Sequence, residues 1–262
     1  MWKQDAMETK KKVRLKVLRS NRGSGKTRAY EQFEVPYEPG MTVLSALLYA
    51  KEMLDHSIAV RYSCRMACCG SCGMVINGVP KLACYTQLTE CPNFEVTVAP
   101  LDHYPLVRDL VTDFEGFFEK HLSVKPFMIR LDEAEQETSE SEYGQSADQL
   151  DDFLQFSQCI KCGLCNAACP TMANDRAFVG PQALAQAYRY VADSRDEGGV
   201  ERLSLVDEEH GVWRCHFAGS CSHVCPKGVD PALAIQRLRR LVISKSSARR
   251  PGSALLPKRL SA

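Results

Sequence analysis

In the N-terminal part of the chain, polar and apolar residues alternate over short stretches. Val13, Leu15 and Val17 alternate with basic residues, which predicts a half-buried strand over residues 12–18. The stretch that follows is polar and contains glycine, as hairpin loops do. A return strand is expected over residues 30–35.

The hydrophobic pattern that follows predicts one helix and a second hairpin. Thr42 can cap a helix over residues 43–54. The apolar face of that helix is expected to consist of Val43, Leu44, Leu47, Leu48 and Leu54. Asn77-Gly78 separates two apolar runs, and this pair favours the type I′ turn because both of its positions need positive φ. With one more strand over residues 94–98, the order of these elements predicts a small mixed sheet packed against one helix.

Helical spacing dominates the rest of the chain. It predicts helices over residues 106–121, after Pro181 and after Asp230-Pro231. Residues 131–149 are acidic and rich in Ser, Glu and Gln, which predicts a surface or mobile segment. The sequence therefore predicts an α+β protein whose sheet comes first and whose helices follow.

Composition narrows the possible classes of protein. The chain has 262 residues and 45% hydrophobic residues, enough for two ordinary domains. A net charge of +1 argues against a nucleic-acid binder. The polar start shows no secretory signal, and no stretch reaches the about 18 apolar residues of a membrane span. We therefore expect a soluble chain whose membrane link, if it has one, runs through a partner.

Thirteen cysteines are the main chemical feature of the sequence. Two runs share the frame C-x2-C-x2-C-x3-C-P, which holds clusters in bacterial ferredoxins. The first run is Cys159-Ile-Lys-Cys-Gly-Leu-Cys-Asn-Ala-Ala-Cys-Pro170, and the second is Cys215-His-Phe-Ala-Gly-Ser-Cys-Ser-His-Val-Cys-Pro226. Zinc or a disulfide framework is the alternative, but the doubled frame argues against both.

In two-cluster ferredoxins, the fourth cysteine of each run binds the cluster of the other run. Applied here, this crossover gives a [4Fe-4S] site with the four thiolates of Cys159, Cys162, Cys165 and Cys225. The other site keeps the three thiolates of Cys169, Cys215 and Cys221. Ala218 stands where the fourth would be, so this site suits [3Fe-4S].

A separate cysteine cluster lies nearer the start of the chain. The plant-type [2Fe-2S] spacing is C-x4-C-x2-C with a distant fourth cysteine. This spacing is met by Cys64, Cys69, Cys72 and Cys84. Cys68 and Cys91 fit no such spacing, and Cys68 is expected to be a small filler beside the cluster. Three clusters form a one-electron relay, which needs a two-electron partner such as a flavin at one end.

The motifs resemble a known family. The stretches Ser-Cys-Arg-Met-Ala-Cys-Cys-Gly-Ser-Cys-Gly-Met (63–74), Asn-Gly-Val-Pro-Lys-Leu-Ala-Cys (77–84) and Val-Cys-Pro-Lys-Gly-Val-Asp-Pro (224–231) are similar to those of the iron–sulfur subunit of succinate dehydrogenase and fumarate reductase. The first of the two long cysteine runs and Phe-Val-Gly-Pro181 agree with it as well. The likeness extends from about Val13 to about Arg240.

The resemblance implies a β-grasp ferredoxin-like domain with [2Fe-2S] over residues 1–105. A helical domain with [4Fe-4S] and [3Fe-4S] would occupy residues 106–262. The implied partners are an FAD-containing flavoprotein and a membrane anchor that holds quinone and often haem. Electrons would pass from succinate through FAD and the three clusters to quinone, or back to fumarate. The complex is expected at the cytoplasmic face of a prokaryotic plasma membrane, with this chain peripheral.

The resemblance also implies residues near the quinone: Pro170, His216 and Arg239. Ubiquinone-type members carry a Trp shortly after the Cys-Pro that corresponds to Cys169-Pro170. Residues 171–174 here are Thr-Met-Ala-Asn, which favours menaquinone. The basic C-terminal stretch, 231–262, fits either a solvated end or contact with an anionic membrane face.

Two other functions compete with this one. The chain could serve a soluble fumarate or thiol–disulfide reductase, although such relatives often carry further cysteine-rich domains. A free ferredoxin-like carrier is the second alternative, but two fused domains argue against it. Co-purification separates the cases, because a carrier elutes alone and a complex subunit brings a flavoprotein with it.

Overall fold

The computed structural model describes residues 11–20, 28–131 and 142–248. The chain divides into two compact units. The first comprises Met1–Phe114 with Ile160–Ala168, and the second comprises Glu115–Cys159 with Cys169–Ala262. Most of the acidic segment expected over residues 131–149 lies outside the described residues, as does the end of the basic C-terminal stretch.

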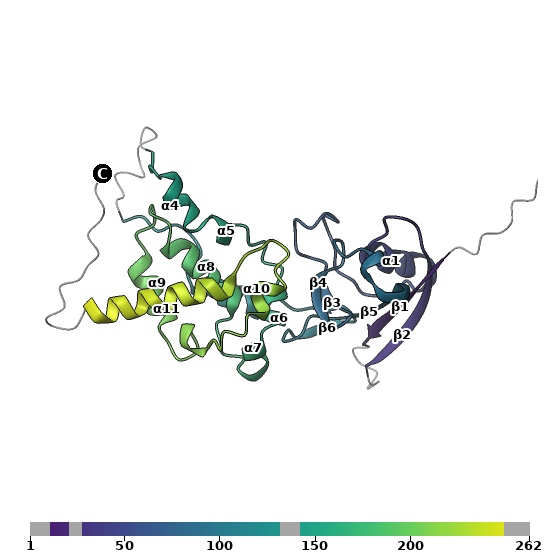
Figure 1. The fold of residues 1–262 in the computed structure, drawn as a ribbon. Helices are drawn as coiled ribbons and strands as arrows, with labels where there is room; N and C mark the ends of the chain where they lie inside the picture. The colour runs from purple at the N-terminus through teal and green to yellow at the C-terminus, as the bar shows by residue number, and fades with distance from the viewer. Residues whose placement is uncertain (1–10, 21–27, 132–141, 249–262) are drawn as a thin grey trace, which may run out of the picture. The chain divides into compact units, whose positions relative to one another are not determined.

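The first unit contains a five-stranded mixed sheet with the order β2-β1-β5-β3-β4 (Figure 1). Its strands are β1 (Lys12–Arg19), β2 (Ala29–Pro36), β3 (Gly73–Ile76), β4 (Val79–Leu82) and β5 (Glu95–Ala99). β1 and β5 run parallel, and the other pairs are antiparallel. Val13, Leu15 and Val17 are fully buried, so the alternation predicted for the first strand is confirmed. The hairpin turn is confirmed as well, because Asn77 and Gly78 have φ of 49° and 81°.

The predicted helix has two parts with different windings. Thr42 caps α1 (Val43–Tyr49) by accepting a hydrogen bond from the Ser45 N–H, and a π-helical turn, η1 (Ala50–Leu54), continues it. The expectation that Leu54 belongs to the buried face is wrong, since Leu54 is exposed. The wider π turn, with its i→i+5 bonds, rotates the last residues away from the apolar stripe.

The helix predicted over residues 106–121 is wrong in its first half. The chain forms a small hairpin there, from β6 (Leu106–Arg108) and β7 (Val111–Thr112), and the helix α2 covers only Glu115–Ser123. Asp109 explains the difference. It has a φ of 46°, and its buried carboxylate accepts hydrogen bonds from the N–H groups of Ser20 (2.8 Å) and Ala59 (2.9 Å). These tertiary bonds outweigh the local helical spacing.

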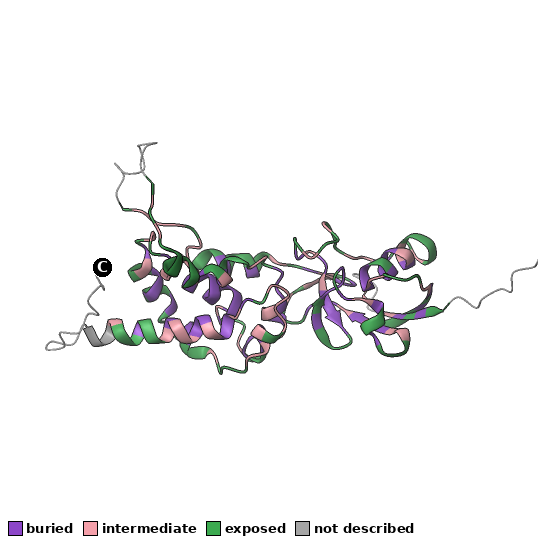
Figure 2. Ribbon diagram, turned by 45° about the horizontal axis from the view of Figure 1, so that its top comes forward, coloured by how far each residue is buried: buried purple, intermediate pink, exposed green. Residues whose placement is uncertain are grey.

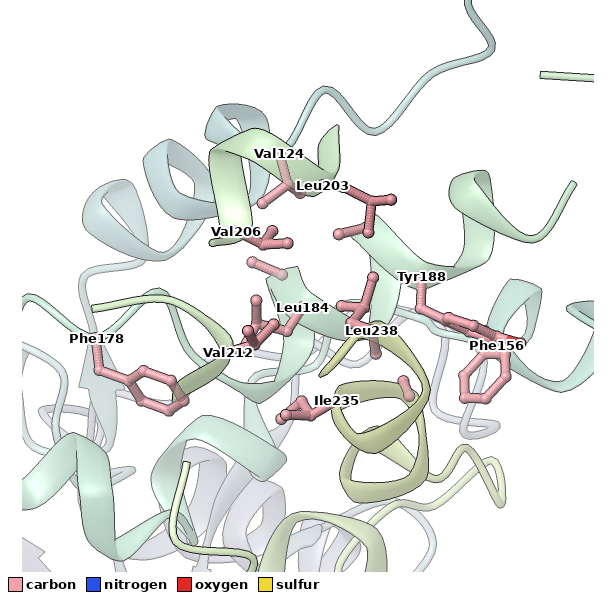
Figure 3. Close-up of a cluster of buried hydrophobic side chains, with 14 of the residues drawn as sticks. Val124, Phe156, Phe178, Leu184, Tyr188, Leu203, Val206, Val212, Ile235 and Leu238 are labelled. Atoms are coloured by element: carbon pink, nitrogen blue, oxygen red, sulfur yellow. The ribbon is translucent and has the colours of Figure 1, made fainter. Parts of the chain in front are cut away.

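The second unit is helical, and both helices predicted after prolines are confirmed. Besides α2 it contains α4 (Ala147–Asp151), α5 (Leu154–Ser157), α7 (Pro170–Asn174), α8 (Pro181–Val191), α9 (Gly199–Val206), α10 (Ser220–His223) and α11 (Pro231–Ala248). Its core gathers side chains from α8, α9 and α11, among them Leu184, Leu203 and Leu238 (Figure 3). Cys169 lies in this core, and Cys215 packs against its edge. The hydrophobic cluster therefore supports the cysteine runs directly.

Burial in the long helices follows the apolar stripe (Figure 2). Most of α8 is buried, whereas α11 buries one face and exposes the other. An ion pair in this unit is completely enclosed, because Arg202 and its partner Asp196 are both 0% exposed. Among the described residues, no helix has the length and apolar character that a bilayer crossing requires.

Candidate iron–sulfur sites

The loop before β3 turns its backbone N–H groups toward cysteine sulfur atoms. The Sγ of Cys64 accepts hydrogen bonds from the N–H groups of Met66 (3.4 Å), Cys68 (3.3 Å) and Cys69 (3.3 Å). Ala67 donates likewise to the Sγ of Cys84, at 3.3 Å. Such donors stabilise thiolate and cluster charge. Arg65, Ala67 and Gly70 have positive φ in this loop, which is how so short a loop aims so many N–H groups at sulfur.

The four predicted [2Fe-2S] ligands lie together and form two pairs. In one pair, the N–H of Cys64 donates to the Sγ of Cys69 at 3.5 Å, and the N–H of Cys69 donates back to the Sγ of Cys64. In the other, the N–H of Cys84 donates to the Sγ of Cys72 at 3.4 Å. Two pairs of thiols are the donor set that a two-iron centre needs, with one pair for each iron. The residues present therefore fit [2Fe-2S].

The two pairs have different surroundings. A hydrogen bond from the Ser71 side chain, against some desolvation, lowers the pKa of Cys69 to about 6. Burial raises the pKa of Cys72 to about 12. Cys69 thus favours the thiolate, whereas Cys72 ionises when a metal binds, since a coordinating thiol is deprotonated outright.

Cys68 and Cys91, which fit no cluster spacing, make contacts unlike those of the ligands. The Sγ of Cys68 donates to the carbonyl of Met66 at 3.4 Å, and its side chain is exposed. Cys91 is buried, with its Sγ 3.9 Å from the carbonyl of Gln87. Desolvation raises the pKa of the Cys91 thiol, as expected for a small buried residue with a structural role.

The two long cysteine runs repeat the same backbone conformation. In the first run, Lys161 and Gly163 have φ of 54° and 78°. In the second, Phe217 and Gly219 have φ of 57° and 75° at the same two positions of the frame. Each glycine then begins a one-turn helix, α6 (Leu164–Ala167) or α10. The sequence repeat is therefore also a structural repeat.

Two thiols of the second unit lie close enough to Cys221 to affect its ionisation. Burial raises the pKa of Cys221 to about 11, and the thiols of Cys169 and Cys215 add to the shift. The N–H of Phe217 donates to the Sγ of Cys215 at 3.3 Å. Ala218 brings only a methyl group to the fourth position. This donor set fits a cluster with three protein ligands.

The ligands predicted for [4Fe-4S] are distributed over the two units. Cys162 and Cys165 belong to the first unit, where Cys162 is buried. Cys159 and Cys225 belong to the second, where both pack against its hydrophobic core. The amide of Gln182 lies 3.9 Å from the Sγ of Cys159.

The residues predicted near a quinone differ in their surroundings. Pro170 and His216 are exposed. The guanidinium of Arg239 donates to three backbone carbonyls at the start of the second cysteine run. These are the carbonyls of Val212 (3.0 Å), Trp213 (3.4 Å) and Cys215 (2.5 Å). Arg239 therefore fixes the backbone next to a predicted ligand, a role that the sequence alone did not indicate.

A second charged side chain, that of Asp175, holds the same segment. Its Oδ2 accepts hydrogen bonds from the Nε of Arg214 (2.8 Å) and lies 2.9 Å from the Nδ1 of His210. Because the His210 and Arg214 contacts outweigh desolvation, the pKa of Asp175 falls to about 2. Asp175 is the C-cap of α7, which starts directly after Cys169, and Arg214 directly precedes Cys215. The sequence reasoning missed this carboxylate, whose position shortly after the first cysteine run was its only signal.

Comparison with known proteins agrees with this geometry. A 2Fe-2S iron-sulfur cluster binding domain matches residues 14–119, and a 4Fe-4S dicluster domain matches residues 155–229. The fold and the thiol groups thus define an iron–sulfur protein with an N-terminal ferredoxin-type sheet domain and a helical dicluster region, and the predicted fold class is confirmed.

Relatives identify the family. The fumarate reductase iron-sulfur subunit of Mycobacterium tuberculosis is 47% identical over 80% of this chain and 84% of its own. The succinate dehydrogenase iron-sulfur subunit of Paracoccus denitrificans is 37% identical, covering 79% and 78%. A chain of the Mycobacterium smegmatis Sdh1 complex in the apo form superposes with a TM-score of 0.80 at 25% identity, covering 89% and 96%. This chain belongs to the family of fumarate reductase and succinate dehydrogenase iron–sulfur subunits.

Proposed function

We propose that the chain relays single electrons between an FAD-containing flavoprotein and a quinone held by a membrane anchor, in a succinate:quinone oxidoreductase. The observation that carries this proposal is the pairing of four thiols in the first unit with the two structurally repeated cysteine runs. Bound clusters supply one-electron carriers, and the chain itself needs no substrate site for this function. The direction, succinate oxidation or fumarate reduction, depends on potentials that the flavin, clusters and quinone set together.

Eleven cysteines hold the clusters in this proposal. The [2Fe-2S] ligands are Cys64, Cys69, Cys72 and Cys84; the [4Fe-4S] ligands are Cys159, Cys162, Cys165 and Cys225; and the [3Fe-4S] ligands are Cys169, Cys215 and Cys221. The N–H donors to the sulfurs of the first loop support the first set, and the influence of the Cys169 and Cys215 thiols on buried Cys221 supports the last. The spacing of the two runs supports the [4Fe-4S] set.

The partners follow from the two ends of the relay. The first unit faces the flavoprotein, and the region of Pro170, His216 and Arg239 in the second unit faces the anchor and its quinone, for which menaquinone is proposed. Two exposed aromatic side chains, Trp213 (45%) and Phe217 (56%), flank His216 and support a surface that a partner covers. Haem, if present, belongs to the anchor, and the complex lies at the cytoplasmic face of the membrane.

Purification tests this assignment of partners. An affinity-tagged chain, extracted in mild detergent from cells that also express the neighbouring reading frames, should retain a flavoprotein and a membrane protein. Cross-links from a probe beside His216 should reach the membrane protein, and those from the hairpin at Asn77-Gly78 should not. Recovery of the tagged chain alone would favour the free carrier, and the opposite cross-linking pattern would reverse the orientation.

Cys68 and Cys69 give a matched pair for testing the ligand set. We expect Cys68→Ala to keep the electron paramagnetic resonance (EPR) signal of reduced [2Fe-2S], because its thiol is bonded to the Met66 carbonyl. Cys69→Ala should lose most of the signal, because it removes one of two thiols on the same iron. Quantified spin per protein is the measurement. Loss in the Cys68 variant with retention in the Cys69 variant would show that the spacing assigns the wrong neighbour.

A further inference from the structure

Segment 160–168 of the first cysteine run packs against the [2Fe-2S] loop within the first unit. A Cβ placed on Gly70 would lie 2.7 Å from the Cβ of Cys162 and 2.9 Å from its Cα. On Gly73, a Cβ would lie 3.2 Å from both the carbonyl oxygen of Cys162 and the Cδ2 of Leu164. Gly70 therefore leaves room for the backbone of Cys162 that no larger residue would leave, and a Cβ on Gly73 would be a tight fit against the same segment.

Aromatic side chains of the same unit hold the segment from another side. The hydroxyl of Tyr104 donates to the carbonyl of Gly163 at 3.0 Å. Its ring stacks on Phe114, with ring centroids 4.6 Å apart and an angle of 13° between the planes. Gly163 again has no room for a side chain, because its Cβ would lie 2.6 Å from the Tyr104 hydroxyl. Segment 160–168 is therefore held in place by three close glycine contacts and one partly buried hydrogen bond.

The contact between Gly70 and Cys162 joins two proposed cluster sites. Gly70 directly follows Cys69 and lies two residues before Cys72, so its backbone is shared with two ligands of the [2Fe-2S] site. Cys162 is itself a proposed [4Fe-4S] ligand. Electron transfer between two centres becomes slower as the distance between them grows. The step breaks no bond and moves no proton. The backbone contact of Gly70 with Cys162 keeps that gap small.

We infer that Gly70 and Gly73 are positioning residues, which set the separation between the [2Fe-2S] thiols and Cys162 and so the coupling between the first two centres of the relay. This inference rests on the proposed function. A methyl group on Gly70 must push segment 160–168 outward, because its nearest neighbours include backbone atoms of Cys162, which cannot rotate away. A methyl group on Gly73 requires a smaller shift, of a few tenths of an ångström. The donors to the [2Fe-2S] sulfurs come from other residues and stay in place.

Two variants and a control separate spacing from backbone strain. Gly73→Ala adds a methyl group without requiring positive φ. Gly70→Ala adds one at a φ of +76°, and Gly78→Ala is its control, because Gly78 has a φ of +81° and no atom within 4 Å of the added Cβ. The holo-complex of each variant is reduced chemically until both centres are paramagnetic. The EPR signal of [2Fe-2S] is then saturated with increasing microwave power.

A nearby paramagnetic centre speeds spin relaxation, so the wild-type signal should resist saturation. In Gly73→Ala and Gly70→Ala, we expect [2Fe-2S] signals that saturate at lower power, with slower onward reduction of the neighbouring centre. Gly78→Ala should match the wild type. If Gly70→Ala fails to assemble its cluster, Gly73→Ala still decides the question. If the [2Fe-2S] signal of Gly73→Ala saturates at the same power as that of the wild type, this inference alone is overturned. If the wild-type signal itself shows no relaxation enhancement, the proposed function is overturned as well.

Discussion

Ala218→Cys is expected to convert the proposed [3Fe-4S] centre to [4Fe-4S]. The two cysteine runs repeat the same backbone conformation, with paired positive φ at Lys161 and Gly163 and at Phe217 and Gly219. Position 218 therefore corresponds to Cys162, and its cysteine can present a thiolate to the fourth corner. Ala218 is exposed, so the larger side chain meets little steric resistance at this position.

The EPR spectrum of the oxidised protein measures this conversion. A [3Fe-4S] centre is paramagnetic when oxidised, whereas an oxidised [4Fe-4S] centre is silent. The wild type should show the signal and the variant should lose most of it while gaining about one iron per protein. Ala218→Ser is the matched control, with similar size and no thiol, and should keep the signal. A wild type without an oxidised signal, or with four irons at this site, would contradict the crossover of ligands.

Asp196→Ala is expected to destabilise the second unit more than any exposed substitution. It removes the carboxylate partner of Arg202 and leaves a guanidinium that is 0% exposed. An uncompensated buried charge costs about 3–5 kcal/mol in the free energy of unfolding, a large share of a typical domain's total. Asp196 also accepts hydrogen bonds from the N–H groups of Ile129 (2.9 Å) and Gly198 (2.8 Å), so a loop loses its anchor with it.

Denaturant unfolding of the holoprotein, followed by helical circular dichroism, tests this expectation. Glu201→Ala is the control, since its partner Lys125 is 38% exposed and Glu201 is 52% exposed. Surface ion pairs are worth about 0–1 kcal/mol. The double variant Asp196→Ala/Arg202→Met should recover part of the loss, because it removes the unpaired charge. Equal midpoints for the Asp196 and Glu201 variants would show that the buried pair contributes little.

Local signals in the sequence predicted much of the fold. Alternation placed β1, the Asn77-Gly78 pair placed the β3–β4 hairpin, and Pro181 marked the start of a helix, because each signal acts through its immediate neighbours. Spacing likewise singled out four cysteines that lie together in the first unit. Where a distant partner decides the structure, the prediction failed. Asp109, bonded to Ser20 and Ala59, turned an expected helix into a hairpin.

Contacts within the tertiary structure account for what the sequence could not predict about the sites. The need for glycine at position 70 depends on Cys162, which is distant in sequence. The role of Arg239 depends on three carbonyls that the fold brings to it. Neither relation leaves a periodic pattern or a fixed spacing. The quinone residues remain a prediction, carried by the family resemblance and by exposed aromatic side chains around His216.

Reduction of the clusters by succinate tests the central claim most directly. The purified complex is mixed with succinate, frozen at successive times and examined by EPR. The account predicts that the oxidised [3Fe-4S] signal disappears and the reduced [2Fe-2S] signal appears within the time of turnover, and that fumarate or an oxidised quinone reverses both changes. Clusters that dithionite reduces but succinate leaves unchanged, in a complex whose flavin is reduced, would contradict the account.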